Sequence, residues 1–323
     1  ELKSDTDFSV LHLNSDNYES TGLPAASIMQ VTVDRTGVLW AGTFRQGAFR
    51  YHPEYASVHY QAVYNSDSQT EDNFATVWAL SENSSDELIL VTQELGLAKF
   101  DKELGKVTYL EHASGQGGRS NYWDLAIDSK GHYWVASSDG LIAYAENEGI
   151  ITQKAHLFQG DIIDHIHYHD DTVWVWHEKF GTLAIDSNAL ANPNKELAAK
   201  KLAIDGLAEN LIPIFTDSLK RLWLRNDTGI TIVSPFSKEI VSHISFEKGL
   251  NSKVYAIYET ADAFWLTTRS DGVVMVDKNS FEIVKRQIRD DKNGYIISSV
   301  GVGRSIWYAN AAGVHQIALP SLT

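Results

Sequence analysis

The residues of this chain best suited to chemistry are three histidines at alternate positions, His165, His167 and His169. Alternate residues of a β-strand point to the same side of a sheet, so these imidazoles are predicted to line up about 7 Å apart. Imidazoles bind Zn²⁺, Ni²⁺ and Cu²⁺, but one strand alone cannot wrap three of them around one ion. We therefore predict no metal site. A site on these elements would use His165, His167 and, from the next strand, His177.

Sequence motifs of common enzymes are absent. The chain has no Gly-x-Ser-x-Gly, no Gly-x-x-x-x-Gly-Lys-Ser/Thr and no His-Glu-x-x-His. Two segments, Asp34-x-x-Gly37-x-x-Trp40 and Asp128-x-x-Gly131-x-x-Trp134, resemble the Asp-box of sialidases but have one extra residue between Asp and Gly. Their aspartates are better explained as acceptors for turn amides. We predict neither enzyme activity nor a cofactor for this chain.

An internal repeat determines the elements that position these side chains. The position of Trp40 in the repeat, called here the slot, recurs in steps of 49, 45, 40, 49, 42 and 42 residues, and a glycine turn follows each time. Short segments rich in Val, Ile, Trp and Tyr flank the slot, as in β-strands. A period in the forties with this pattern predicts a β-propeller, with the slot tryptophans packed between blades. The slot residues are Trp40, Ile89, Trp134, Trp174, Trp223, Trp265 and Trp307.

The repeat predicts an all-β fold, a seven-bladed propeller of four-stranded antiparallel blades in one domain over residues 1–323. The inner strands are predicted to begin near residues 28, 77, 122, 163, 211, 254 and 297. The last repeat has no room for a fourth strand, so residues 8–13 are expected to complete blade seven. That pairing closes the ring and protects edge strands. The segment 186–207, which contains the helix-prone run 195–201, is expected to form an elongated loop or short helix within blade four.

Aromatic and charged residues recur at places predicted to meet at one mouth of the central channel. The second residue of the inner strand is aromatic in three repeats, and the turns between second and third strands add charges. Flat rings with polar groups at the rim are typical of sugar or peptide recognition. The alternative is that the aromatic residues simply plug the channel. The predicted ligand-binding residues are Trp78, Trp123, Tyr255, Asp164, Arg45, Glu94, Asp139, Lys179 and Arg269.

Composition excludes several classes of partner. The net charge is −15 and the pI is near 5.2, whereas proteins that bind nucleic acids cluster Lys and Arg on one surface. The chain has no cysteine, which excludes disulfides and thiolate zinc sites. No apolar run is long enough to cross a membrane. Any membrane attachment is therefore expected through a segment outside this chain.

The first repeat resembles the two-component-regulator propeller repeat. The residues that carry the resemblance are Val33-Asp34-Arg-Thr-Gly37-Val-Leu-Trp40-Ala-Gly-Thr43, followed by Gly47 and Tyr51 and preceded by Gly22-Leu-Pro24. The resemblance covers nearly the whole chain, unevenly. It implies a periplasmic sensor domain whose output half is a hybrid histidine kinase or a diguanylate cyclase, and whose ligands are often oligosaccharides. It identifies no catalytic residues.

Three functions are compatible with these observations. The first is a ligand-sensing input domain that binds an oligosaccharide or peptide and signals through rearrangement of a homodimer in the full-length protein. The second is a propeller lyase or hydrolase acting on a polysaccharide, with His165, His167 or Asp164 as the base. The third is a protein-interaction or dimerisation scaffold without a small ligand.

Overall fold

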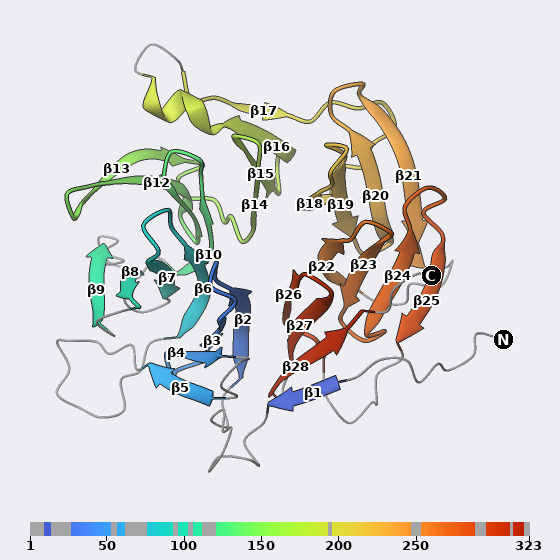
Figure 1. The fold of residues 1–323 in the computed structure, drawn as a ribbon. Helices are drawn as coiled ribbons and strands as arrows, with labels where there is room; N and C mark the ends of the chain where they lie inside the picture. Colours follow the sequence, from blue (N-terminus) through green and yellow to red (C-terminus); the bar gives the residue numbers. More distant parts are fainter. Residues whose placement is uncertain are drawn as a thin grey trace.

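The computed structural model describes residues 10–13, 27–52, 57–61, 76–92, 96–102, 106–111, 121–192, 196–246, 253–287, 295–310 and 313–319. Within these ranges the chain forms seven four-stranded antiparallel sheets. Figure 1 shows the sheets arranged in a ring. The predicted seven-bladed propeller is confirmed. No helix in the described part of the chain is long and apolar enough to cross a membrane.

Strands pair in chain order within each blade, from the inner strand outward. Blade one contains β2 (Ile28–Val33), β3 (Leu39–Thr43), β4 (Ala48–His52) and β5 (Ser57–Gln61). Blade two contains β6 (Val77–Glu82), β7 (Leu88–Thr92), β8 (Gly96–Asp101) and β9 (Lys106–Glu111). Blade three contains β10 (Tyr122–Ile127), β11 (Tyr133–Ser137), β12 (Gly140–Asn147) and β13 (Ile150–Leu157).

The second half of the ring follows the same plan. Blade four contains β14 (Ile166–His169), β15 (Thr172–His177), β16 (Gly181–Asp186) and β17 (Ala199–Lys201). Blade five contains β18 (Ile212–Thr216), β19 (Leu222–Asn226), β20 (Gly229–Ser234) and β21 (Glu239–Ser245). Blade six contains β22 (Val254–Glu259), β23 (Ala263–Thr268), β24 (Val273–Asp277) and β25 (Ile283–Gln287). Blade seven contains β26 (Ser298–Val302), β27 (Ser305–Asn310), β28 (Gly313–Ala318) and β1 (Val10–Leu13).

The N-terminal strand closes the ring. β1 pairs antiparallel with β28, from Val10 opposite Ile317 to Leu13 opposite Val314, and the two strands lie side by side in Figure 1. Each inner strand contacts the next around the whole ring, including β26 with β2. Ring closure by the predicted N-terminal strand is confirmed for residues 10–13, while residues 8 and 9 lie outside the described ranges.

The slot tryptophans fill the space between blades. Trp40 and Trp223 are at most 2% exposed. The Trp40 ring meets Phe100 of blade two edge-on, with ring centroids 5.3 Å apart. Trp223 lies 4.5 Å from the Phe264 ring of blade six. Aromatic pairs of this kind stabilise beyond their buried area, so these residues hold the blades together as predicted.

Aspartate fixes the turn between the inner and second strands. Asp34 Oδ1 accepts hydrogen bonds from the backbone N–H groups of Thr36 and Val38, at 2.9 and 3.1 Å. Asp34 Oδ2 accepts one from Trp40 Nε1 at 2.8 Å. The predicted turn-amide role is confirmed, and the bond to the indole is a second role that the sequence did not reveal. The same aspartate–indole bond recurs in Asp128–Trp134 and Asp217–Trp223.

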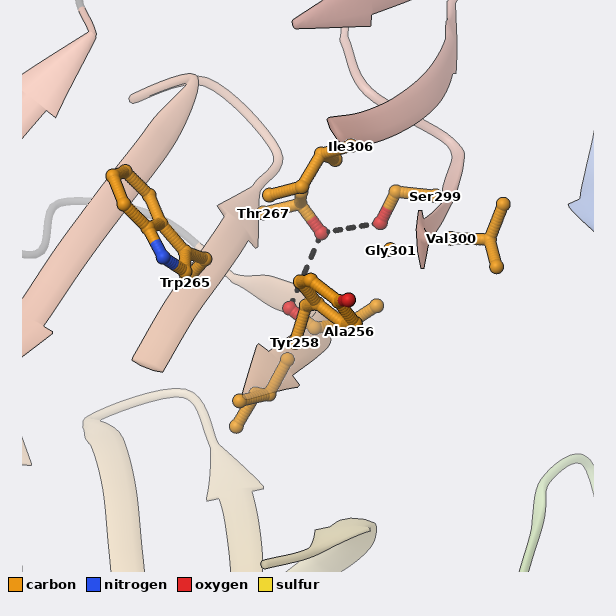
Figure 2. A pocket seen from close by; sticks show the side chains of 9 residues that line it. Ala256, Tyr258, Trp265, Thr267, Ser299, Val300, Gly301 and Ile306 are labelled. Carbon is orange, nitrogen blue, oxygen red and sulfur yellow. Dashed lines mark hydrogen bonds between the residues drawn. The ribbon is translucent and has the colours of Figure 1, made fainter. Parts of the chain in front are cut away.

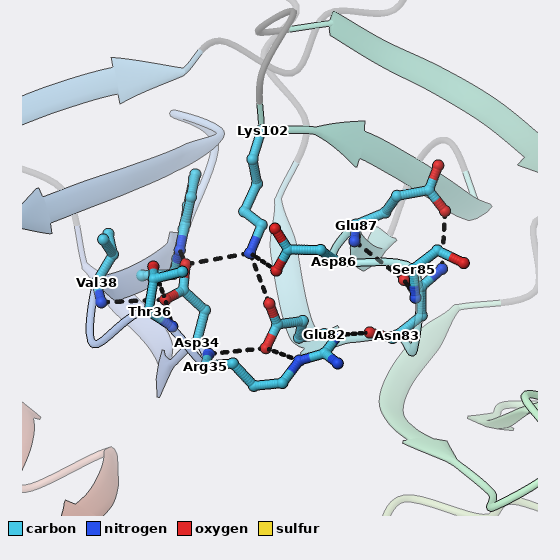
Figure 3. Close-up of polar contacts among 11 residues, drawn as sticks. Asp34, Arg35, Thr36, Val38, Glu82, Asn83, Ser85, Asp86, Glu87 and Lys102 are labelled. Atoms are coloured by element: carbon cyan, nitrogen blue, oxygen red, sulfur yellow. Dashed lines mark hydrogen bonds and ion pairs between the residues drawn. The ribbon is translucent and has the colours of Figure 1, made fainter.

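These turns lie on the face where the inner strands end, called here the bottom face, and Figure 3 shows how charges pair there between blades one and two. Lys102 Nζ lies 2.6 Å from Glu82 Oε1, 2.7 Å from Asp86 Oδ1 and 3.4 Å from Asp34 Oδ2. Although burial opposes its charge, bonds to Asp86 and Glu82 raise the pKa of Lys102. We call Lys102, Asp34, Glu82 and Asp86 the bottom-face network.

Blade four departs from the prediction at both edges. Its inner strand begins at Ile166 rather than near residue 163. Ile163 N donates to Ser137 O of blade three at 3.0 Å, so the chain joins the neighbouring blade before it pairs with β15. The elongated loop or short helix expected over 186–207 is confirmed in part, by a short helix, and is wrong for residues 199–201. Residues 199–201 form β17 against β16, and the one-turn 3₁₀ helix η2 (Ser187–Ala191) comes earlier. Sheet pairing here overrides helix propensity.

Candidate functional site

Two sets of loops meet on the face where the inner strands begin, called here the top face. In blade six, Arg269 N in the β23–β24 turn donates to the carbonyl of Lys253, just before β22, at 2.8 Å. In blade one, Phe44 N donates to Ser27 O at 2.8 Å in the same way. The backbone therefore joins the hairpin turn to the start of the inner strand, which places both loop sets at one channel mouth.

A β-bulge lies at the second position of four inner strands. In β2, β6, β10 and β22 the pairing register shifts across this residue. A bulge displaces its residue from the regular ladder and re-aims the side chain. Three of the predicted ligand-binding aromatic residues thus share one backbone feature next to the top face. The bulged residues are Met29, Trp78, Trp123 and Tyr255.

Two cations that the sequence analysis missed lie beside Tyr255. Arg225 Cζ is 5.8 Å and Lys253 Nζ is 5.9 Å from the centroid of the Tyr255 ring. Arg225, on β19, is 9% exposed and donates from Nη1 to Val254 O at 2.6 Å. Its Nε is buried without a hydrogen-bond partner. Within the described ranges neither cation forms a salt bridge, although Asp164 acts on both through its charge.

Burial and neighbouring charges set the electrostatics of this region. Burial lowers the pKa of the Arg225 guanidinium. Burial also lowers the pKa of Lys253, and the charge of Arg225 lowers it further, against the opposing effect of Asp164. Arg269 lies with its Cζ 4.4 Å from the Tyr295 ring centroid and also lowers the pKa of Lys253. We call Arg225, Lys253, Tyr255, Asp164 and Arg269 the top-face cluster.

Two other predicted ligand-binding residues support the connection between blades three and four. Lys179 Nζ lies 2.7 Å from Asp161 Oδ1. Asp139 Oδ1 accepts a hydrogen bond from Gly160 N at 2.8 Å. Both partners belong to the segment that leads from β13 into blade four. The contacts explain these two charges without a ligand.

The remaining predicted residues lie in other blades. Arg45 is exposed, with its Cζ 5.3 Å from the ring centroid of the adjacent Phe44. Trp78 and Trp123 are half-buried on their bulges. Glu94 lies outside the described residues. The structure therefore gathers three of the nine predicted residues, Tyr255, Asp164 and Arg269, around Lys253.

Each candidate metal-binding histidine has a different partner. His167 Nε2 lies 2.8 Å from Thr216 Oγ1, and His177 Nε2 lies 3.2 Å from Asp161 Oδ2. Burial, followed by the charges of His165 and His169, lowers the pKa of His167 to about 3. In the described ranges no group of three or more His, Cys, Asp or Glu side chains could hold a metal ion.

The pair formed by His165 and Asp124 is the arrangement most similar to a catalytic one. His165 Nδ1 lies 2.9 Å from Asp124 Oδ2, which orients the ring and leaves Nε2 as its basic nitrogen. That Nε2 is buried and has no hydrogen-bond partner. Substrate atoms cannot reach it in this conformation.

A cavity of about 240 Å³ lies between blades six and seven (Figure 2). The hydroxyls of Thr267 and Ser299 in its wall lie 2.5 Å apart, and Thr267 Oγ1 also donates to Ala256 O at 3.2 Å. Because these polar groups are already hydrogen-bonded within the protein, they have little hydrogen-bonding capacity left for a ligand in the cavity. The Tyr258 ring lies against Gly301, where an added Cβ would meet the ring 2.0 Å away.

Comparison with known proteins shows the fold and assigns no family. No protein-family model matches the chain, and no curated protein matches it. The two-component-regulator propeller resemblance therefore stays a prediction.

Solved structures with similar propellers include proteins of different kinds. Virginiamycin B lyase from Staphylococcus aureus is 16% identical, with a TM-score of 0.71, over 97% of this chain and 100% of its own. The extracellular domain of the hybrid two component system BT4673 from B. thetaiotaomicron is 14% identical, with a TM-score of 0.72. That match covers 98% of this chain but 43% of the other. YCF48 bound to D1 peptide is 9% identical over 99% of each chain, with a TM-score of 0.70.

Proposed function

We propose that this propeller is the extracytoplasmic, ligand-sensing input domain of a bacterial membrane-bound signalling protein, and that its top face binds an oligosaccharide. The observation that carries the proposal is the top-face cluster, in which an aromatic ring on a bulge lies within 6 Å of two cations that form no ion pair within the described residues. Arg225 is 9% exposed, and a charge held away from water without an ion pair costs stability, which a binding role explains. The likeness to the extracellular domain of BT4673 supports a sensing role.

The signal in this proposal passes through the arrangement of two propellers rather than through a change within one. Seven blades packed through buried aromatic rings form a stiff ring. A ligand that binds one arrangement of a periplasmic homodimer better than another shifts the population toward it. A hybrid histidine kinase or diguanylate cyclase, attached through a membrane segment outside this chain, would read that shift.

A lyase or hydrolase is the second candidate. The likeness to virginiamycin B lyase and the pair of His165 and Asp124 favour it. Two observations weigh against it. His165 Nε2 is closed to substrate, and a pKa near 3 makes His167 a weak base at neutral pH. We therefore propose binding without turnover.

A thermal-shift screen of the purified chain against oligosaccharides tests the proposal. A ligand that binds only the folded state raises the melting temperature in a saturable way. The shift should be lost in Trp123→Ala and Tyr255→Ala and retained in Phe236→Ala, because Phe236 is fully exposed in the β20–β21 turn, at the opposite end of β20 from the top face. Cleavage of the bound oligosaccharide by the wild type, abolished by His165→Gln, would instead establish an enzyme.

A further inference from the structure

We infer that the ligand carries a carboxylate, which binds between Arg225 and Lys253, and that the oligosaccharide therefore contains a uronic acid. The inference rests on the proposed function, because it takes the top face as the ligand site, and it adds the chemical class of the ligand. Three observations carry it: the place of Arg225 in the repeat, the lack of an ion pair for either cation within the described residues, and the groups that surround them.

Arg225 occupies a position that is small in every other blade except blade four, which has Trp176. Arg225 stands two residues after the slot tryptophan, and the corresponding Gly42 of blade one packs so closely that a Cβ there would lie 2.8 Å from Val77 O. In blade five the guanidinium fills this space between blades and bonds the equivalent carbonyl, that of Val254. The residues at this position are Gly42, Val91, Ala136, Trp176, Arg225, Thr267 and Ala309.

The two cations keep hydrogen-bonding capacity that the described protein does not use. Within the described residues only Nη1 of the Arg225 guanidinium has a hydrogen-bond partner, Val254 O. Its Nε is buried, and no carboxylate in the described residues forms a salt bridge with Arg225 or Lys253. This is notable in a chain of net charge −15, where carboxylates are plentiful. A planar guanidinium next to an ammonium matches a carboxylate in charge and in geometry.

The neighbouring groups favour a sugar as the carrier of that carboxylate. The Tyr255 ring lies within 6 Å of both cations and can cover the apolar face of a pyranose. The exposed Asp164 carboxylate is close enough to act on Arg225 and Lys253 through its charge. It can accept hydrogen bonds from sugar hydroxyls and repels a second acid. A uronate residue supplies both a carboxylate for the cations and hydroxyls from which a carboxylate such as Asp164 can accept hydrogen bonds.

The test compares acids with their neutral methyl esters by isothermal titration calorimetry. The probes are trigalacturonate and a trisaccharide containing glucuronate, each paired with its fully methyl-esterified form. We expect the acid to bind about tenfold more tightly than its ester, the effect of roughly one charge-assisted hydrogen bond. Raising the NaCl concentration should weaken binding of the acid and leave that of the ester unchanged.

Charge variants locate the carboxylate. Lys253→Gln is an exposed substitution and should remove about tenfold of the affinity for the acid and none for the ester. Arg225→Lys should retain part of the preference, because it keeps the charge and loses the planar fork. Lys154→Gln, exposed on β13, changes the net charge equally and should have no effect. Equal losses in Lys253→Gln and Lys154→Gln would overturn the assigned site.

The remaining outcomes separate this inference from the proposed function. Equal affinity for acid and ester would overturn the carboxylate and leave the sugar-binding proposal standing. Binding of free trialanine but not its amide, without binding of any sugar, would overturn both the uronate and the oligosaccharide. Failure of all these probes together with the neutral oligosaccharide panel would overturn the proposed function and this inference with it.

Discussion

The two faces of the propeller treat a buried lysine or arginine in opposite ways. On the bottom face, Lys102 is 11% exposed and lies within 3.4 Å of three carboxylates. On the top face, Arg225 is 9% exposed and no carboxylate in the described ranges forms a salt bridge with it. The bottom-face network is complete within the protein, whereas the top-face cluster has capacity left for another molecule. A charge that is paired within the protein, such as Lys102, is therefore structural, whereas an unpaired one, such as Arg225, is a candidate for binding.

The difference follows from how each face is encoded. The bottom-face turn repeats the same aspartate and indole in blades one, three and five, so its contacts are local and recur with the repeat. The top-face loops differ from blade to blade in sequence. Functional residues concentrate on such variable loops while a rigid scaffold positions them.

Removing the Asp34 carboxylate, which accepts the hydrogen bonds of the bottom-face turn, should lower the stability of the fold more than any other change considered below. Asp34→Ala leaves the buried Trp40 indole N–H and two turn amides without their acceptor and removes one of the three carboxylates around Lys102. We expect the free energy of unfolding in urea to fall by about 3 kcal/mol or more. Asp262→Ala, an exposed aspartate in the corresponding turn of blade six, should change it by less than about 0.5 kcal/mol. Equal effects would show that the turn network is not structural.

The same substitution on the two faces tests the comparison directly. Lys102→Met leaves Asp34, which is 1% exposed, without its cation and leaves Glu82, 10% exposed, with Arg35 alone, and should cost about 2 kcal/mol. Lys253→Met removes a charge whose pKa burial lowers, so it should be neutral or slightly stabilising. Urea unfolding of both variants in one buffer measures the difference. A comparable loss in Lys253→Met would mean that the top-face cluster also stabilises the fold.

The sequence predicted the features that recur with the repeat and missed those that depend on how strands and blades pair. The blades and the role of β1 followed from periodicity and from a strand without an inner partner. The start of blade four was wrong because Ile163 bonds to blade three, a tertiary contact without a local signal. The bulges at Trp78, Trp123 and Tyr255 were likewise invisible, since register depends on the partner strand.

The top-face cluster was only partly accessible from the sequence. Tyr255, Asp164 and Arg269 came from comparing inner strands and turns, and all three lie near Lys253. Arg225 was missed because the comparison stopped at those positions. Aligning the repeats two residues past the slot would have found it, as the one charged residue among Gly, Ala, Val, Thr and Trp. Its unpaired state needed the structure.

As the pH falls, His167 on the inner strand of blade four should affect stability before Asp34 on the bottom face does. The pKa of His167 is lowered to about 3, so between pH 6.5 and 3 the unfolded chain binds a proton that the folded chain does not. Stability therefore falls as pH falls, by about 1–2 kcal/mol between pH 7 and pH 5. Asp34, whose pKa hydrogen bonds hold below its ordinary value against burial, contributes only below about pH 4. Urea unfolding of His167→Gln should show a flatter profile from pH 7 to 5; an unchanged slope would assign the effect to other groups.

The smallest effect is expected where a short ion pair is exposed. Lys179 Nζ lies 2.7 Å from Asp161 Oδ1, nearly the distance that joins Lys102 to Glu82, but the Lys179 side chain is 63% exposed. Water and salt screen such a pair, and ordering two long side chains offsets the attraction. Lys179→Gln should leave the urea midpoint unchanged, at low and at high NaCl alike. A loss comparable to that of Lys102→Met would show that distance, rather than burial with several partners, makes the bottom-face network structural. The difference between Lys102 and Arg225 would then be only that Lys102 lies close to carboxylates and Arg225 does not.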